Sequence, residues 1–352
     1  RFTTADPGYG IYAYEISRSS NEYFLGLTDA HTGALGKVYS EASAAGLAQA
    51  ALLSDIFLRT GLESAVSATS GRGFGISAIM GYSDQRIHTG SHVDLEGASG
   101  LVTLAYNKKG TPLSLGVFGE LFSGRYETSN RAVTPLGRFN VESEGDLESY
   151  GGGLFIQYRQ RLAEALESGA FTIWIPGLHL EAVARAGYSR MDFATNAANP
   201  SQIDKNGGMY YGASLGGGYV FEPAPKFAVD LYGHGTWVRL AARDADDNLG
   251  QHIEFRRADS LRLVSGFRAA YALKERVRPY AGLAVDWETM GRPDVYINGY
   301  RADRADFSGV SGLLELGVGI EEGDSIFIDI KAAGSVGKRS GIGGLIELKY
   351  KF

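Results

Sequence analysis

The final stretch of the chain, residues 341–352, constrains the fold more than any other segment. Its side chains alternate between two kinds, an apolar set of Ile342, Ile346, Leu348, Tyr350 and Phe352, and a charged set of Glu347, Lys349 and Lys351. A period of two is that of an extended strand with two different faces. A soluble sheet turns the apolar face to a core, whereas a membrane barrel turns it to lipid. One strand fits both folds, so the rest of the chain must decide.

The composition favours a barrel that crosses a membrane with strands. The 352 residues include 49 Gly, 20 Tyr and 17 Phe, and no stretch reaches the roughly 18 continuous apolar residues of a spanning helix. The net charge of −6 argues against a nucleic-acid partner. The absence of cysteine excludes disulfides, thiolate metal sites and a cysteine nucleophile. The chain opens at Arg1 without a signal peptide, which we interpret as a mature form or a fragment.

Two segments precede the strand-rich part. Residues 1–34 contain two short alternating runs joined by polar residues, which indicates a hairpin or one rung of a stacked β structure. Residues 38–60 contain six alanines, which predicts a slim helix ending near Gly61. At 1.5 Å per residue this helix is roughly 33 Å long, close to the roughly 30 Å of a bilayer core.

From Gly71 to the end, the alternation predicts twelve strands. Their approximate centres are Ile79, Val102, Val117, Leu154, Ala184, Leu215, Leu231, Leu263, Leu283, Leu316, Ile328 and Ile346. The connections alternate as well: short turns are expected on one side and long polar loops on the other, at about 125–146, 193–208, 242–259 and 289–309. Short turns opposite long loops are typical of an outer-membrane barrel. The connection 160–177 departs from this pattern, and its residues 161–167 suggest a small interfacial helix.

Strand number and helix width agree. Twelve tilted strands enclose a lumen of about 12 to 14 Å once side chains are subtracted. A helix with its side chains is about 10 to 12 Å wide, so one helix fits and two do not. The sequence therefore predicts an all-β fold, a twelve-stranded antiparallel transmembrane barrel with one N-terminal helix through its lumen.

This arrangement resembles the translocator domain of type V autotransporters. The resemblance rests on the twelve strands, the alanine-rich helix before them and the final Tyr350-Lys-Phe352. It implies a passenger stub at 1–37, a pore helix and linker at 38–70 and an outer-membrane barrel at 71–352. It also implies Ala44, Leu47, Ala48, Ala51 and Asp55 inside the pore, and Tyr350 and Phe352 as the signal read by the barrel-assembly machinery. The partners are then outer-membrane lipid and the chain's own passenger, and we expect a monomer.

The resemblance also bears on passenger cleavage. Some members of the family cleave the passenger inside the barrel with an Asn of the pore helix. Residues 38–60 contain no Asn, so we predict no cleavage by that route.

The inward positions of the strands carry charges of both signs. The expected lumen-facing charges are Glu120, Glu181, Arg185, Arg262, Arg268, Asp286, Glu315, Asp329, Lys331 and Glu347. Mixed signs favour a hydrated, mutually neutralised pore wall; alternatively, some of these residues contact the helix or a passing polypeptide. We predict no catalytic residue, metal or cofactor.

Three functions fit this reading. The favoured hypothesis is a translocator that exports and anchors an N-terminal passenger without bond chemistry. The alternative is a helix-plugged porin or diffusion channel. A barrel hydrolase ranks third, with the lumenal His234 as its candidate residue. His88 and His92 with Asp94 form a weak metal candidate, because solvated histidines in a loop are common.

Overall fold

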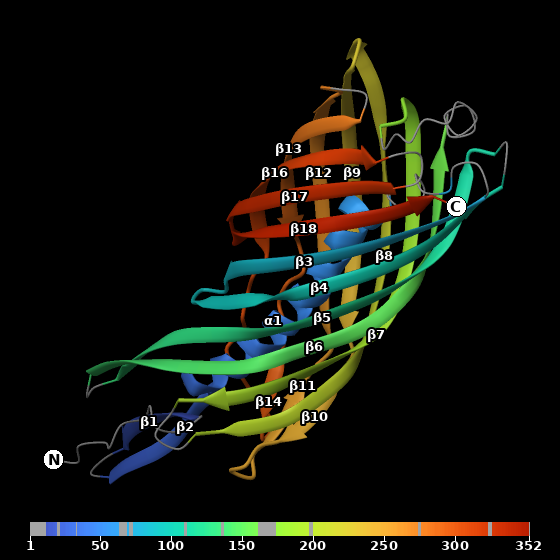
Figure 1. Ribbon diagram of the computed structural model, residues 1–352. Helices are drawn as coiled ribbons and strands as arrows, with labels where there is room; N and C mark the ends of the chain where they lie inside the picture. The colour runs from blue at the N-terminus through green and yellow to red at the C-terminus, as the bar shows by residue number, and fades with distance from the viewer. Residues whose placement is uncertain are drawn as a thin grey trace.

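A closed ring of antiparallel strands surrounds one helix (Figure 1). The computed structural model describes residues 12–19, 22–32, 34–62, 69, 73–108, 111–134, 137–160, 174–196, 200–273, 276–322 and 326–351. Residues 161–167 and Phe352, both subjects of sequence predictions, lie outside these ranges. Within them the predicted twelve-stranded barrel is confirmed, and each predicted strand centre falls within a different barrel strand. The strands are β3 (Phe74–His88), β4 (His92–Asn107), β5 (Leu113–Thr134), β6 (Gly137–Arg159), β7 (Gly177–Thr195), β8 (Gln202–Ala224), β9 (Phe227–Leu240), β12 (Ala258–Tyr271), β13 (Val277–Glu288), β16 (Gly309–Glu322), β17 (Ile326–Gly337) and β18 (Arg339–Lys351).

The first and last strands close the ring. β18 pairs with β3 from Arg339 opposite Ile87 to Lys351 opposite Gly75, so neither strand is left with a free edge. Closure is required in hydrocarbon, where an unpaired N–H or C=O group finds no water. The short turns and both ends of the barrel chain lie at one end, here called the turn end. The long hairpins lie at the other, the loop end. In outer-membrane barrels the short turns face the periplasm.

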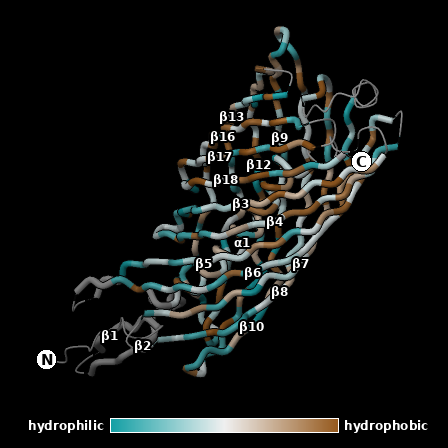
Figure 2. The backbone as a smooth tube through the Cα atoms, in the orientation of Figure 1, coloured by the Kyte–Doolittle hydropathy of each residue, from teal (hydrophilic) through white to brown (hydrophobic). Residues whose placement is uncertain are grey.

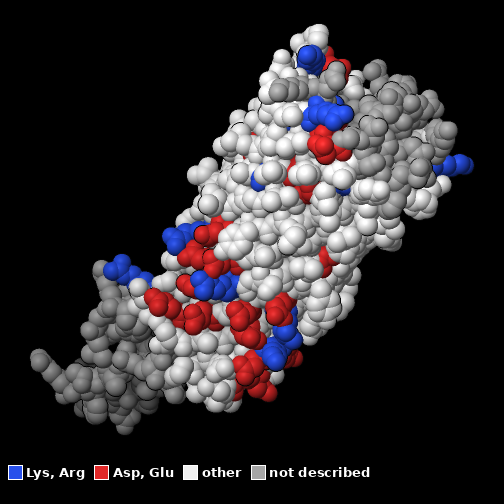
Figure 3. All heavy atoms as spheres, in the orientation of Figure 1, with Lys and Arg blue, Asp and Glu red and all other residues white. Residues whose placement is uncertain are grey.

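The outer face of the barrel is apolar along its middle. On β18 the side chains of Ile342, Ile346, Leu348 and Tyr350 are exposed, whereas Glu347 and Lys349 are buried inside. The brown segments in Figure 2 follow this band around the visible strands. Most charged side chains visible in Figure 3 gather toward the two ends of the molecule. This is the surface of a barrel that presents apolar side chains to lipid.

Several strands continue beyond this band. β5, β6 and β8 are 22, 23 and 23 residues long, although about 9 to 11 residues cross a bilayer. The loops predicted at 125–146 and 193–208 are therefore wrong, because most of these residues continue the β5–β6 and β7–β8 hairpins. Beyond the lipid an outward face needs no apolar residue, so these strand ends are polar and look like loops.

A second sheet covers the loop end. β10 (Arg243–Asp246), β11 (His252–Phe255), β14 (Val295–Ile297) and β15 (Tyr300–Arg301) pair in that order. They come from the connections predicted as loops at 242–259 and 289–309, so those predictions are also wrong. We call these four strands the cap sheet. Their inward side chains Ile253, Phe255, Val295 and Ile297 are buried, which supplies the apolar face that two loops alone would lack.

The helix runs through the ring (Figure 1). α1 spans Ala34–Ile56 and continues into one π-helical turn, η1, at Phe57–Gly61. The helix predicted at 38–60 thus begins four residues earlier and ends in a different geometry. Within the described residues no helix is long and apolar enough to span a membrane. Before the helix, β1 (Tyr12–Ser19) and β2 (Glu22–Thr32) pair as an antiparallel hairpin, one of the two forms that the sequence left open.

The lipid-facing surface gives a prediction of stability. Ile346 lies outward near the middle of β18, paired with Ile330 and Met80 of the neighbouring strands. We expect Ile346→Arg to lower the free energy of unfolding by about 2–4 kcal/mol, because a cation there must enter hydrocarbon. Ser129→Arg, on the outer face of the β5 extension, should change it by less than about 0.5 kcal/mol. Denaturant titration in lipid vesicles measures both, and equal costs would contradict this placement of the lipid band.

Candidate functional site in the barrel lumen

The functional site is the interface between the helix and the inner wall, and its character changes along the helix. Around the N-terminal half the wall is apolar. Val38, Tyr39, Ala42, Ala45 and Leu47 of α1 belong to one buried cluster with wall and cap residues. Its other members include Ile87, Val93, Leu95, Phe122, Tyr126, Val141, Leu147, Met191, Phe193, Ile203, Val238, Ile253, Phe255, Val295 and Ile297. This apolar collar holds the N-terminal half of the helix by burial.

Two polar side chains anchor the helix within the collar. The Glu41 carboxylate is fully buried and accepts hydrogen bonds from Thr89, Ser91 and Asn130, which belong to the β3–β4 turn and β5. The Tyr39 hydroxyl lies 2.6 Å from Ser201 Oγ and donates to Asp247 of the β10–β11 turn at 3.3 Å. Such bonds satisfy groups whose burial would otherwise cost free energy. They tie the start of the helix to three connections of the loop end.

Midway along the helix the contacts become ionic. Gln49 donates to Ser149 Oγ at 2.7 Å, and Arg185 donates to Ser54. Arg185 also pairs with Glu120, with Nη2 2.8 Å from Oε1, and Tyr210 donates to the same carboxylate. Each buried charge here has a counter-charge, as burial in a low dielectric requires.

The next ionic layer joins the helix to β12, β13 and β18. Asp55 Oδ2 lies 2.5 Å from Arg262 Nη1 of β12. Arg262 is only 2% exposed and also pairs with Asp286 of β13, which in turn accepts from Arg339 of β18 at 2.5 Å. A chain of alternating charges thus runs from the helix to three wall strands, β12, β13 and β18.

Glu315 of β16 is the centre of the last ionic layer. Arg59 of η1 lies 2.5 Å from it, Arg268 pairs with it, and Lys331 Nζ lies 3.9 Å away. Arg268 and Lys331 also donate to the backbone oxygen of Arg59, each at 3.2 Å. Cations beside the last carbonyls suit the negative end of a helix dipole. One carboxylate therefore organises three cations around the helix end.

The opposite side of the helix end is apolar. Phe57, Leu58 and Leu62 form a buried cluster with the inward side chains of β3 to β7, among them Leu101, Phe118, Phe155 and Val183. Phe57 stacks on Phe118 with ring centroids 4.0 Å apart. Gly61 packs so closely on Leu101 that a Cβ there would overlap it. The helix end is thus held by apolar packing on one side and by charges on the other.

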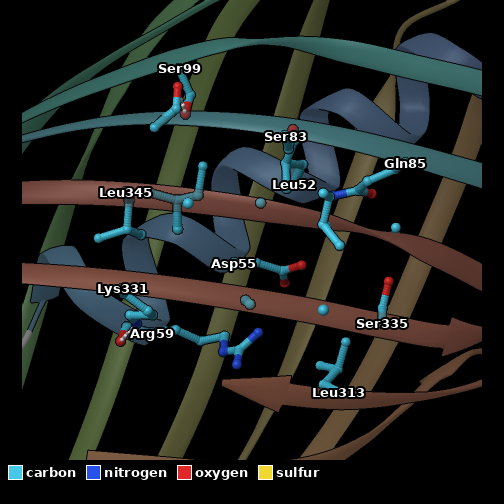
Figure 4. Close-up of a pocket in the computed structure, with 18 of the residues that line it drawn as sticks. Leu52, Asp55, Arg59, Ser83, Gln85, Ser99, Leu313, Lys331, Ser335 and Leu345 are labelled. Atoms are coloured by element: carbon cyan, nitrogen blue, oxygen red, sulfur yellow. Dashed lines mark hydrogen bonds between the residues drawn. The ribbon is translucent and has the colours of Figure 1, made fainter. Parts of the chain in front are cut away.

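A cavity of about 110 Å³ remains beside the helix, next to β17, β18 and β3 (Figure 4). In Figure 4, Asp55 and Arg59 extend from the helix toward it, with Ser83 and Gln85 on one side and Lys331 and Ser335 on the other. Small wall residues, including Gly81, Gly343 and Gly344, leave this space. Polar side chains of the helix and of the wall line it together with apolar ones.

The predicted site residues occupy distinct places. Ala44, Leu47, Ala48 and Ala51 are buried, and Asp55, Arg185, Arg262, Arg268, Glu315 and Lys331 reach the helix directly. Glu120 and Asp286 pair with Arg185 and Arg262, which in turn contact the helix. Glu181, Asp329 and Glu347 pair within the wall, with His179, Tyr280 and Lys349 respectively. Tyr350 faces outward, where it is 45% exposed.

Sequence reasoning missed several contacting residues. Glu41, Gln49 and Arg59 lie within the predicted helix, but helix periodicity does not say which wall group each meets. Arg339 is not among the predicted lumen-facing charges, although it begins β18 and reaches Asp286. The apolar collar was missed too, although the sequence contains a signal for it: along a strand, the apolar residues move from the outward positions to the inward positions. In β3 the outward apolar residues Met80 and Tyr82 give way to outward Asp84 and Arg86, while Ile87 turns inward.

The histidines do not form a site in the described part of the chain. His234 faces the lumen and is 7% exposed, with its Nε2 unpartnered. His92 Nε2 lies 3.8 Å from Asp94 at the loop end. Among the described residues no group of three or more His, Asp or Glu side chains is placed to hold a metal ion.

Comparison with known proteins agrees with this geometry. The family model described as Autotransporter beta-domain matches residues 115–328, more than half of the chain. The translocator domain of NalP from Neisseria meningitidis is 12% identical, with 88% of this chain and 100% of that chain covered and a TM-score of 0.65. The transport unit of AIDA-I from Escherichia coli is 14% identical, with 80% and 91% covered and a TM-score of 0.58. The beta domain of the Bordetella autotransporter BrkA is 14% identical, with 80% of this chain and 100% of that chain covered and a TM-score of 0.55. No curated protein sequence matches the chain.

The ionic layer at Glu315 gives the next prediction. Glu315→Gln leaves three buried cations without their shared carboxylate, so we expect the free energy of unfolding to fall by about 3–5 kcal/mol. Glu148→Gln removes the same charge from the exposed pair with Arg190 and should cost less than about 1 kcal/mol. Denaturant unfolding of both variants measures the difference. A cost for Glu315→Gln as small as that of the exposed control would show that Glu315 does not hold the cluster together.

Proposed function

The chain belongs to the autotransporter β-domain family, and from that premise we propose that its barrel exports the segment N-terminal to α1 and anchors it at the cell surface. Family membership makes the protein a barrel of the bacterial outer membrane, and translocator domains of this family are transport units rather than enzymes. Export of a passenger is the part that we propose.

The path of the helix is the observation that carries the proposal. Lys37, near the start of α1, donates to Ser91 of the β3–β4 turn, whereas Arg59 and Thr60 contact β16 and β17 deep in the ring. The chain before the helix therefore lies at the loop end, and the barrel chain begins at the turn end. Short turns face the periplasm in such barrels, so the residues before α1 lie on the outer side of the membrane. A polypeptide in that position has crossed through or with the barrel.

We propose the following division of the chain. Residues 1–37 are the end of the passenger, 38–70 the pore helix and linker, and 71–352 the barrel. Tyr350 and Phe352 are proposed as the signal for the barrel-assembly machinery, and the barrel as a monomer. The strand β18 that carries this signal also closes the ring onto β3.

The lumen chemistry supports transport without bond chemistry. The ionisable groups that reach the helix engage counter-charges or hydrogen-bond partners, as at Arg185–Glu120 and Asp55–Arg262. Paired groups of this kind fix a helix and neutralise each other, and they do not form a nucleophile–base arrangement. A plugged diffusion channel would share this lumen but would keep its N-terminus in the periplasm.

The location of the N-terminus tests the proposal. We would place an epitope tag before Arg1, express the chain with a secretory signal and treat intact cells with protease. The tag should be lost from intact cells, because we place the N-terminus outside. Protection of the tag until the outer membrane is broken would contradict export and favour the channel.

Two internal controls use the same barrel. A tag in the turn between β14 and β15, at Asn298–Gly299, should be cleaved on intact cells. A tag in the turn between β8 and β9, at Lys226, should be protected. The opposite result for this pair would mean that the barrel is inserted the other way round. The N-terminal tag is therefore judged against markers for both sides.

A further inference from the structure

β6 and β7 are connected at the turn end of the barrel. Short turns are usual there, yet this connection spans 160–176. Its last described part, Trp174-Ile-Pro176, precedes β7 directly. Trp174 is 7% exposed and Ile175 is 6% exposed, although a connection at a barrel rim is expected to lie in water. Two large apolar side chains are therefore folded into the molecule at its periplasmic opening.

The partners of Trp174 show that it crosses the opening. Its ring lies 6.0 Å from the ring of Tyr280, centroid to centroid, and Tyr280 belongs to β13. From β7 to β13 the ring passes through β8, β9 and β12. Four strand spacings around such a barrel measure roughly 25 Å along the wall, far more than a side chain can follow. Trp174 reaches Tyr280 only by lying across the lumen.

The residues that receive Trp174 are an apolar set on inward faces. They form one buried cluster with it: Val220, Ala228, Ala270, Tyr280 and Phe327. They come from β8, β9, β12, β13 and β17. Inward apolar residues at the rim of a lumen need a partner to be shielded from water. Trp174 is that partner.

Ile175 occupies the other half of the opening. It belongs to the buried cluster of Phe57, Leu58 and Leu62 at the helix end, with inward residues of β3 to β7. The consecutive residues Trp174 and Ile175 thus belong to two apolar clusters that together draw on ten of the twelve barrel strands. Both residues come from the connection at the turn end, so they approach the lumen from its periplasmic side.

We propose that Trp174 and Ile175, from the β6–β7 connection, form a second closure of the pore at the end of the helix, which seals the lumen against the periplasm. A narrow apolar layer excludes water and ions because its interior does not stay wetted. The helix blocks the lumen along its length, and the closure covers the end through which periplasmic solutes would enter. An exported chain must displace this closure first. Trp174 then packs back into the opening once the helix occupies the lumen.

Conductance of the intact chain in planar bilayers tests the closure. A loosened-helix variant, Asp55→Ala with Arg59→Ala, removes two ionic anchors of the helix and should stay largely closed. Adding Trp174→Ala should raise the mean conductance at least about tenfold, because both seals then fail. The matched control adds Trp287→Ala instead, which removes a tryptophan that faces lipid and is 51% exposed. Its conductance should stay at the level of the loosened-helix variant.

Two results would overturn the closure. Either the loosened-helix variant alone conducts as much as the variant that also lacks Trp174, or Trp174→Ala adds no more than Trp287→Ala. The folded state of each variant is first checked by the heat-dependent change in its gel mobility.

A second measurement does not depend on a variant at position 174. In Trp237→Phe with Trp287→Phe, Trp174 is the single tryptophan, because the chain has three. Its fluorescence should be blue-shifted and quenched several-fold less by aqueous iodide than that of free tryptophan. Quenching equal to that of free tryptophan would also reject the closure.

Discussion

Closure of the sheet is the constraint on which the rest of the structure depends. In hydrocarbon each backbone N–H and C=O must find a partner within the protein, and a sheet achieves this only as a ring. The register from Arg339–Ile87 to Lys351–Gly75 completes that ring and sets its circumference. A ring of twelve strands leaves a lumen that one slim helix fills. The alanines of α1 and the inward glycines of β18 and β3 are consequences of that fit.

The strands carry two patterns in succession, and the helix is held differently by each. Within the membrane the outward face is apolar and the inward face is charged, as at Ile346 and Glu347. Toward the loop end the pattern reverses, so Arg86 faces water and Ile87 faces the helix. The upper part is therefore built like a soluble barrel around a hydrophobic core. Burial holds the first half of the helix. Paired charges hold one side of the second half, where an unpaired charge would cost several kcal/mol.

The sequence predicted the part of the fold that lipid dictates. All twelve strand centres and the helix follow from alternation against a hydrocarbon environment and from alanine content, both local properties. The extensions of β5 to β8 and the cap sheet did not follow, because polar outward faces there look like loops. The alternation of side chains along each strand correctly predicted that Arg262 and Glu315 face the lumen. It did not show that Arg262 meets Asp55, or that Arg59 joins Glu315, because those pairs depend on the height and rotation of the helix relative to the wall.

The π-helical turn lies where the helix meets an apolar wall on one side and an ionic wall on the other. Near Ile56 the helix has apolar strands β3 to β7 on one side and the ionic residues of β16 and β17 on the other. In η1 the Leu62 N–H donates to the Phe57 oxygen, five residues back, which widens the turn by one residue. This extra residue lets Phe57, Leu58 and Leu62 share the apolar side while Arg59 and Thr60 face the charges. Gly61 then touches the wall without a side chain. The irregular turn is thus the local adjustment that lets one helix satisfy two unlike walls at once.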